Sequence, residues 1–101
     1  MATLTLAQAN PTIRDLTVTE EALSVAFSDG RVISLPLSWY PRLSHAKPED
    51  RVQWRFTGRG RGIHWPNLDE DISAENILHG EASSESAKSF RKWREWYGGN
   101  R

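Results

Sequence analysis

The sequence predicts an α+β fold in which a small antiparallel sheet of about five short strands, arranged in hairpins, packs with short helices and a C-terminal aromatic helix. Short runs of alternating apolar and polar residues recur between glycines and prolines, which is typical of hairpins. Other segments space their apolar residues as helices do, most clearly near the C-terminus. The 101 residues also include five Trp, three Phe and two Tyr, so aromatic rings should dominate the core of a single domain.

Three strands are predicted in the first half of the chain, where apolar and polar residues alternate. They cover residues 13–19, 23–28 and 31–35. The segment 1–10 lacks this pattern and is followed by Pro11, so we interpret it as a flexible N-terminal arm. The α+β domain is therefore expected over residues 11–80. Residues 81–101 are expected to form a C-terminal helix that packs on the domain or docks on a partner.

The turn at Asp29-Gly30 predicts a hairpin. A two-residue loop would pair polar with apolar residues, whereas a three-residue loop beginning at Ser28 keeps like residues opposite each other. The pairs expected from the three-residue loop are Leu23 with Leu35, Ser24 with Ser34 and Val25 with Ile33. Such a loop holds its last residue in the left-handed conformation, so Gly30 should have a positive φ.

A short helix is predicted after Pro36, which stops the third strand. Ser38 is placed to cap this helix. Pro41 falls in its first turn, where a missing amide proton does no harm. The apolar face of the helix is expected to comprise Trp39, Leu43 and Ala46. One further helical turn is expected at residues 48–51.

A second hairpin is predicted by the plainest strand pattern in the chain, at residues 52–57. The glycine-rich turn 58–62 follows, and a short strand over residues 63–65 continues the apolar face. That face is expected to comprise Val52, Trp54, Phe56, Ile63 and Trp65. Pro66 lacks the amide proton that would extend the strand.

Two helices are predicted in the C-terminal third of the chain. An acidic loop at 69–71 leads to Ser73, a candidate N-cap, and Gly80 ends the short helix that follows. A longer helix is predicted over residues 84–97. Its apolar face is expected to comprise Phe90, Trp93 and Tyr97.

Charge is segregated along the chain, although the formal net charge is zero. Residues 51–61 contain four Arg, residues 69–85 contain six acidic residues, and residues 88–101 contain five basic residues and one acidic residue. Zero net charge excludes the global attraction to nucleic acid that a strongly basic protein has. Cysteine is absent, which excludes disulfides and thiolate metal sites. Without a signal-peptide pattern or an apolar stretch of membrane-spanning length, the expected protein is cytoplasmic and does not bind membranes.

Four segments carry a family resemblance. They are Phe27-x-Asp29-Gly30-Arg31, Leu35-Pro36-Leu37-x-Trp39-Tyr40-Pro41-Arg42-Leu43, Gly62-Ile63-His64-Trp65-Pro66-x-Leu68-Asp69-Glu70-Asp71-Ile72-Ser73 and Leu78-x-Gly80. Together, over about residues 11–80, they make the chain resemble the bacterial DUF2442 family, a family of unknown function.

The resemblance implies a small α+β domain that stands alone or is fused ahead of a helix-turn-helix. It also implies a gene that neighbours the gene of another small uncharacterised protein, in an arrangement like a toxin–antitoxin pair. The resemblance brings no assigned catalytic residue. Because the chain ends at Arg101 with one aromatic helix and no room for a helix-turn-helix domain, direct reading of DNA is not favoured.

The acidic residues near His64 have two interpretations. His64 with Asp69, Glu70 and Asp71 would form a metal or acid–base cluster in an enzyme-like domain, although their spacing matches no established ligand loop. Alternatively, the carboxylates precede a helix N-terminus, which favours negative charge, and His64 hydrogen-bonds to one of them. We expect the structural interpretation, so no catalytic residue, cofactor or metal site is predicted.

Two surfaces are candidates for binding a partner. The arginines around the glycine-rich turn either hold a phosphate or partner, or keep a hairpin loop soluble. The aromatic face of the last helix either closes the core or docks in a groove on another protein. The candidate partner-binding residues are Arg55, Arg59, Arg61, His64, Phe90, Trp93, Trp96 and Tyr97.

The function favoured by the sequence is that of a small non-catalytic protein-binding or regulatory adaptor, such as the antitoxin-like member of a two-gene pair. Its partner would be a protein, for example the product of a neighbouring gene. One alternative is a nucleic-acid-binding transcriptional regulator, and another is a small ligand- or metal-binding enzyme-like domain. The sequence contains no Ser-His-Asp, P-loop or dinucleotide-binding pattern.

Overall fold

The computed structural model describes residues 10–99 and contains two antiparallel sheets of three strands each. The first sheet comprises β1 (Ile13–Val18), β2 (Ala22–Phe27) and β3 (Val32–Pro36), in the order β1-β2-β3. The second sheet comprises β4 (Arg55–Thr57), β5 (Gly62–Trp65) and β6 (Glu70–Ser73), in the order β4-β5-β6. The helices are the 3-10 helix η1 (Leu37–Trp39) and the α-helices α2 (Pro41–Ser44), α3 (Pro48–Arg51), α4 (Ala74–Leu78) and α5 (Ala87–Gly99).

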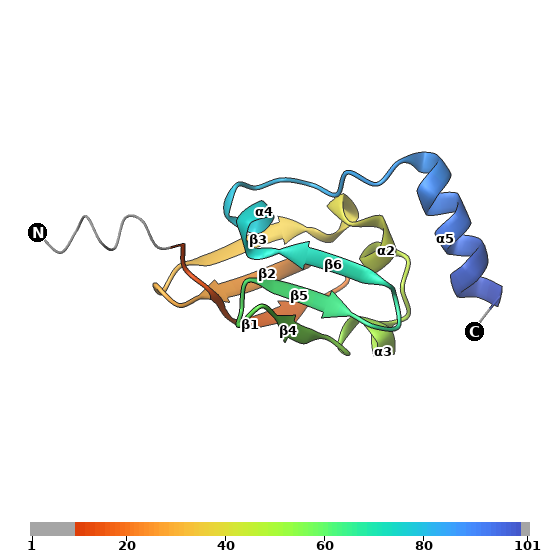
Figure 1. Cartoon of the computed structure of the whole chain (residues 1–101). Helices are drawn as coiled ribbons and strands as arrows, with labels where there is room; N and C mark the ends of the chain where they lie inside the picture. The colour runs from red at the N-terminus through yellow and green to blue at the C-terminus, as the bar shows by residue number, and fades with distance from the viewer. Residues whose placement is uncertain (1–9, 100–101) are drawn as a thin grey trace, which may run out of the picture.

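The predicted α+β class is confirmed, and the strands of residues 10–99 form two sheets rather than one (Figure 1). The chain passes through η1, α2 and α3 between β3 and β4, so β4 pairs with β5 and not with β3. Most of the segment predicted as an N-terminal arm, residues 1–9, lies outside the described residues. No helix in the described part of the chain is both long and apolar enough to cross a membrane.

The register predicted for the hairpin of β2 and β3 is confirmed. The observed partners are Leu23 with Leu35, Ser24 with Ser34 and Val25 with Ile33. The two serine hydroxyl oxygens of this set lie 2.6 Å apart. Gly30 has a φ of 94°, as the three-residue loop requires.

Replacing Gly30 with alanine should lower the free energy of unfolding by roughly 1 kcal/mol, because an L-residue resists this positive φ. A Cβ added at Gly30 meets no atom within 4 Å, so the cost should come from the backbone alone. Urea denaturation measures it. Gly98→Ala is the matched control, because Gly98 lies in α5 and its added Cβ also meets nothing within 4 Å. Equal losses at both glycines would contradict the conformational explanation.

The acidic segment predicted as a loop is instead part of a strand. Residues 70–73 form β6, in which Ile72 pairs with Ile63 and Asp71 pairs with His64 of β5. Ile72 is the only apolar residue of β6, so this strand has no alternation that the sequence reveals. Ser73 caps α4 as predicted, because its hydroxyl accepts the N–H of Asn76 at 3.0 Å.

The helix predicted between Ser38 and Ala46 is broken in the middle. Tyr40, which precedes Pro41, has φ −124° and ψ 87° and separates η1 from α2. A residue before proline is disfavoured in the helical conformation because its backbone clashes with the proline ring. Pro41 therefore begins α2, and Ser38 makes no side-chain capping bond.

Buried residues from both sheets form one core. The fully buried members of this core include Leu23, Val25, Ile63, Trp65, Leu68 and Ile77. The indole N–H of Trp65 donates to the carbonyl of Arg51 at 2.9 Å, so the polar atom of this ring is satisfied. Val52 and Phe56, which were predicted on the apolar face, are exposed because Val52 precedes β4 and β4 is a short strand at the edge of its sheet.

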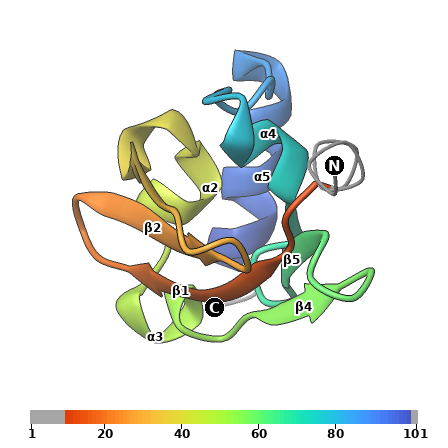
Figure 2. The same cartoon turned by 90° about the vertical axis from the view of Figure 1, so that its left-hand side faces the viewer.

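The two sheets meet where β1 begins. The Ile13 N–H donates to the Gly60 carbonyl at 2.8 Å, which connects β1 to the turn between β4 and β5. Figure 2 shows the start of β1 beside these two strands. A Cβ on Gly60 would lie 3.0 Å from the Ile13 carbonyl oxygen, so this close approach needs glycine.

Candidate functional site

An aromatic stack holds α5 at one end of the two sheets (Figure 1). Its rings are Phe90, Trp93 and Tyr97, with centroids 5.7 Å apart in the first pair and 4.7 Å apart in the second. The Trp93 indole N–H donates to the Leu68 carbonyl at 2.7 Å, and the Tyr97 hydroxyl hydrogen-bonds with the Asp50 carboxylate. Trp93 and Tyr97 are therefore buried by their own domain and are not exposed to a partner.

A serine and a glutamate fix the beginning of α5. The Ser86 hydroxyl accepts a hydrogen bond from the N–H of Ser89 at 3.0 Å and caps the helix. The helix therefore starts after Ser86, whereas the sequence predicted a start at Ser84. The Glu85 carboxylate accepts from the Ser89 hydroxyl at 2.8 Å and from the Arg42 guanidinium at 2.6 Å. The start of α5 is thus connected to α2 by a charged bridge.

Arg42 is the centre of this bridge. Besides Glu85, its guanidinium contacts the Asp69 carbonyl at 2.7 Å and lies 5.8 Å from the centroid of the Trp93 ring. Burial alone would raise the pKa of Glu85, but the hydrogen bonds from Arg42 and Ser89 outweigh it and lower this pKa. The hydrogen bond with Glu85 likewise raises the pKa of Arg42. Each charge therefore keeps the other ionised.

A groove lies between α5, α2 and the loop before β6. Its volume is about 510 Å³. It is lined by Arg42, Asp69, Ser86, Lys88, Ser89, Lys92, Trp93 and Trp96, and we call it the Trp96 groove. Trp96 is 46% exposed. Lys88, Lys92 and Trp96 follow one another at intervals of four residues, so they form one stripe along α5.

A second cavity, of about 350 Å³, shares Arg42, Asp69 and Ser89 with the Trp96 groove. Glu70 lines this cavity, and burial raises the pKa of its carboxyl group to about 7, although the nearby charge of Arg42 acts in the opposite direction. Burial also raises the pKa of Tyr40, together with the negative charges of Glu70 and Glu81. An ionised Glu70 is therefore costly to the folded state.

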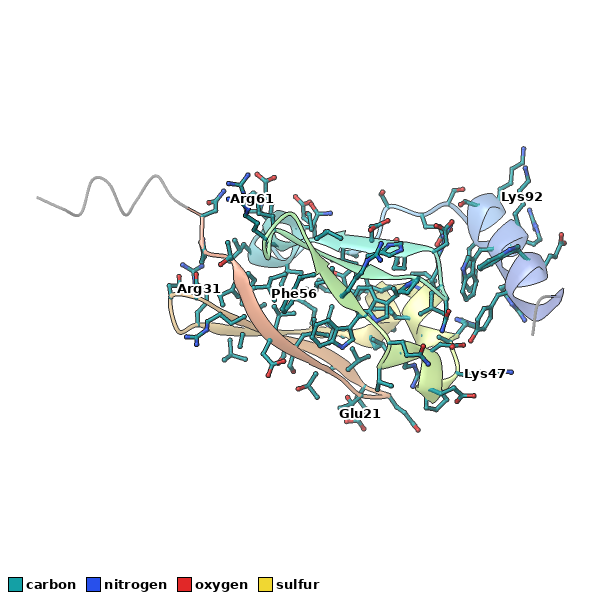
Figure 3. All side chains as sticks on the ribbon, turned by 60° about the horizontal axis from the view of Figure 1, so that its bottom comes forward. Glu21, Arg31, Lys47, Phe56, Arg61 and Lys92 are labelled. Carbon is teal, nitrogen blue, oxygen red and sulfur yellow. The ribbon has the colours of Figure 1, made fainter. Side chains whose placement is uncertain are left out.

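The two surfaces that the sequence offered as partner-binding candidates, the arginine-rich turn and the last helix, do not meet. Arg61 and Lys92 lie at opposite ends of the molecule in Figure 3. Arg59 and Arg61 are exposed in the turn between β4 and β5, where Arg59 has a φ of 60°. The arginines of this turn and the basic residues of α5 therefore form two separate surfaces.

His64 belongs to a polar row across the second sheet. It lies opposite Arg55 of β4 and opposite Asp71 of β6, and its Nδ1 is 2.9 Å from the Asp71 carboxylate. The side chains of Asp69 and Asp71 are 76% and 70% exposed, so these acids lie on open surface and not in a closed pocket. Within residues 10–99, no group of three ligating side chains is placed to hold a metal ion.

Five residues that line the groove were not singled out from the sequence as site residues, namely Arg42, Ser86, Lys88, Ser89 and Lys92. Lys88 and Lys92 could have been found from the sequence, because their four-residue spacing from Trp96 places them on the same stripe of the helix. Arg42 carried no such signal, because its partners Asp69 and Glu85 are distant in sequence and only the fold brings them together.

The chain matches the family described as "Protein of unknown function (DUF2442)" over residues 13–83. Among solved structures, it is similar to a protein of unknown function from Rhodospirillum rubrum, with a TM-score of 0.65 and 20% identity, over 76% of this chain and 95% of that one. It is also similar to an uncharacterized protein from Chromobacterium violaceum, with a TM-score of 0.62 and 21% identity, over 89% of this chain and 81% of that one. At these identities the two structures show a shared fold. No curated protein matches the chain.

Proposed function

The chain belongs to the DUF2442 family of proteins of unknown function, and we propose that it is a non-catalytic protein-binding module whose partner docks on the Trp96 groove. The observation that carries this proposal is the half-exposed Trp96 in a groove of about 510 Å³. Tryptophan buries a large area on binding and loses little conformational freedom, because it has only two side-chain torsions. Binding energy in protein interfaces concentrates at such residues.

The groove is held in shape before any partner arrives. Trp93 anchors α5 through its hydrogen bond to the Leu68 carbonyl, and Arg42 bridges α2 to Glu85. A binding surface whose side chains are already fixed loses less entropy on association. The anchoring of α5 through Trp93 and Arg42 supports a docking role for the groove.

Nucleic acid is a less favourable ligand for the same surface. The basic residues of α5 lie at the opposite end of the molecule from Arg61, so one duplex would contact only part of the positive charge. The groove also contains Asp69, and the charge of Arg42 is met by Glu85. Few phosphates would be neutralised, and affinity for nucleic acid rises with the number neutralised.

Replacing Trp96 with alanine should weaken partner binding by about tenfold or more, because it removes the aromatic side chain from the stripe of Lys88, Lys92 and Trp96. The immobilised protein is used to capture its partner from the native host, and the product of a neighbouring gene is the first candidate to purify. Isothermal titration calorimetry with the purified partner then gives the dissociation constant for wild type and variant.

Phe56→Ala is the matched control for this experiment. Phe56 is an exposed aromatic residue of β4, outside the groove, so its replacement should leave the affinity within about twofold. Capture of a protein alone does not support the proposal. A partner that loses affinity with Phe56→Ala and keeps it with Trp96→Ala would place the docking surface on the second sheet and overturn the assignment of the groove.

A further inference from the structure

We propose that the segment bound by the Trp96 groove is an acidic stretch of a protein partner with one large apolar side chain that packs on Trp96. This inference rests on the function proposed above and names the chemistry of the partner. Two features of the groove carry it, the charge of its exposed stripe and the position of its aromatic ring.

The charge comes from Lys88 and Lys92, which are both exposed on α5. Among the described residues, Arg42 forms an ion pair with Glu85, whereas neither Lys88 nor Lys92 forms an ion pair. Lysines one helical turn apart have Cβ atoms about 5 to 6 Å apart, which matches two carboxylates one turn apart on a partner helix or two residues apart on a partner strand. The exposed face of the groove is therefore complementary to acidic residues in pairs.

The apolar contact comes from Trp96, one further turn along the same stripe. Its half-exposed ring and Trp93 both line the groove, so a side chain such as leucine or phenylalanine would contact apolar surface there. A segment with two acids followed or preceded by one apolar residue, all on one face, fits the stripe. Apolar burial supplies affinity, and the lysines supply orientation and selectivity.

Phosphate groups also carry negative charge, but the groove favours carboxylates on a protein. Two lysines neutralise few phosphates, and Asp69 in the groove wall repels a polyanion that follows the surface. A peptide with separate acidic residues can turn its carboxylates toward Lys88 and Lys92 and away from Asp69. The stripe therefore fits a short acidic protein segment better than a nucleic-acid backbone.

The test pans a phage-displayed library of random peptides on the wild-type chain and on the Trp96→Ala variant. We expect the peptides enriched only by wild type to contain paired Asp or Glu residues and one Leu, Ile, Phe or Trp. An enriched peptide should then bind the Lys88→Glu/Lys92→Glu variant about tenfold or more weakly, and bind Lys88→Arg/Lys92→Arg within a few fold of wild type.

The double variant Arg91→Glu/Arg94→Glu is the matched control, because these exposed basic residues lie on α5 but do not line the groove. Its effect should be several-fold smaller than that of Lys88→Glu/Lys92→Glu. Enrichment of neutral or basic peptides that still need Trp96 would overturn the acidic partner and leave the docking function intact. No enrichment, or enrichment independent of Trp96, would overturn both.

Oligothymidine is the probe that tests for binding of nucleic acid. Binding of this probe that Lys88→Glu/Lys92→Glu abolishes, with affinity falling steeply between about 50 and 200 mM salt, would overturn the inference in favour of a nucleic-acid site. Binding of the acidic peptide should instead fall only mildly over that range, because burial of aromatic surface supplies most of its affinity.

Discussion

Replacing Trp93 with alanine is expected to lower the free energy of unfolding by about 3 to 5 kcal/mol, the range for truncating a buried aromatic side chain. The residue is 5% exposed, and its N–H donates to the Leu68 carbonyl. The substitution removes the ring that stacks on both Phe90 and Tyr97, and it takes away the donor for that carbonyl. The 13 residues of α5 are too few for a stable isolated helix, so α5 should also lose its helical structure.

Urea denaturation measures the loss of stability, and hydrogen exchange of the α5 amides measures the loss of the helix. Trp96→Ala is the matched control, because it removes the same side chain from the same helix at a half-exposed position. Its cost should be about 1 kcal/mol or less. Equal costs for the two substitutions, or protected α5 amides in Trp93→Ala, would contradict the conclusion that Trp93 anchors the helix.

Replacing Glu70 with glutamine is expected to stabilise the protein by about 2 to 3 kcal/mol above pH 7, after allowance for the part of the side chain that reaches solvent. Burial raises the pKa of Glu70 from 4.5 to about 7. The folded state therefore holds this proton more tightly than the unfolded state does. The stability that the proton contributes is fully present below pH 4.5 and is lost as the pH rises to about 7. Glutamine stays neutral throughout and avoids the loss.

The measurement is urea denaturation of wild type and Glu70→Gln at a series of pH values. The difference in unfolding free energy between them should grow from about pH 4.5 to about pH 7 and stay level above that. Glu75→Gln, which removes an exposed carboxylate from α4, controls for the loss of one negative charge. A difference that does not change with pH would show that ionised Glu70 carries no burial cost in the folded state.

Local features of the fold were predictable from the sequence because neighbouring residues decide them. The register of β2 and β3 follows from matching like residues across a short loop, and the positive φ of Gly30 follows from that loop. The break at Tyr40 was also a local effect, but the apolar spacing around it suggested a continuous helix. By contrast, β6 depends on pairing with β5 and carries only one inward apolar residue, Ile72, so its own sequence does not reveal it.

The candidate site was predictable in part. Aromatic residues at helical spacing pointed to α5, and the groove includes Trp93 and Trp96 from that set. Which aromatic side chains face the domain is decided by Leu68 and Asp50, which hydrogen-bond to Trp93 and Tyr97 only in the folded chain. The contribution of Arg42 likewise depends on contacts between segments distant in sequence, and a single sequence does not show such contacts.

The order of strands in the two sheets has a consequence for the kinetics of folding. Every strand pair in both sheets joins neighbours in sequence. Closing a short loop costs little conformational entropy, because that cost grows with loop length, so each meander can form early and independently. The hydrogen bond from Ile13 to Gly60 joins residues much farther apart in sequence and closes a far longer loop. Docking of two preformed meanders should therefore be the slow step of folding, and the contact between β1 and the turn after β4 should form late in it.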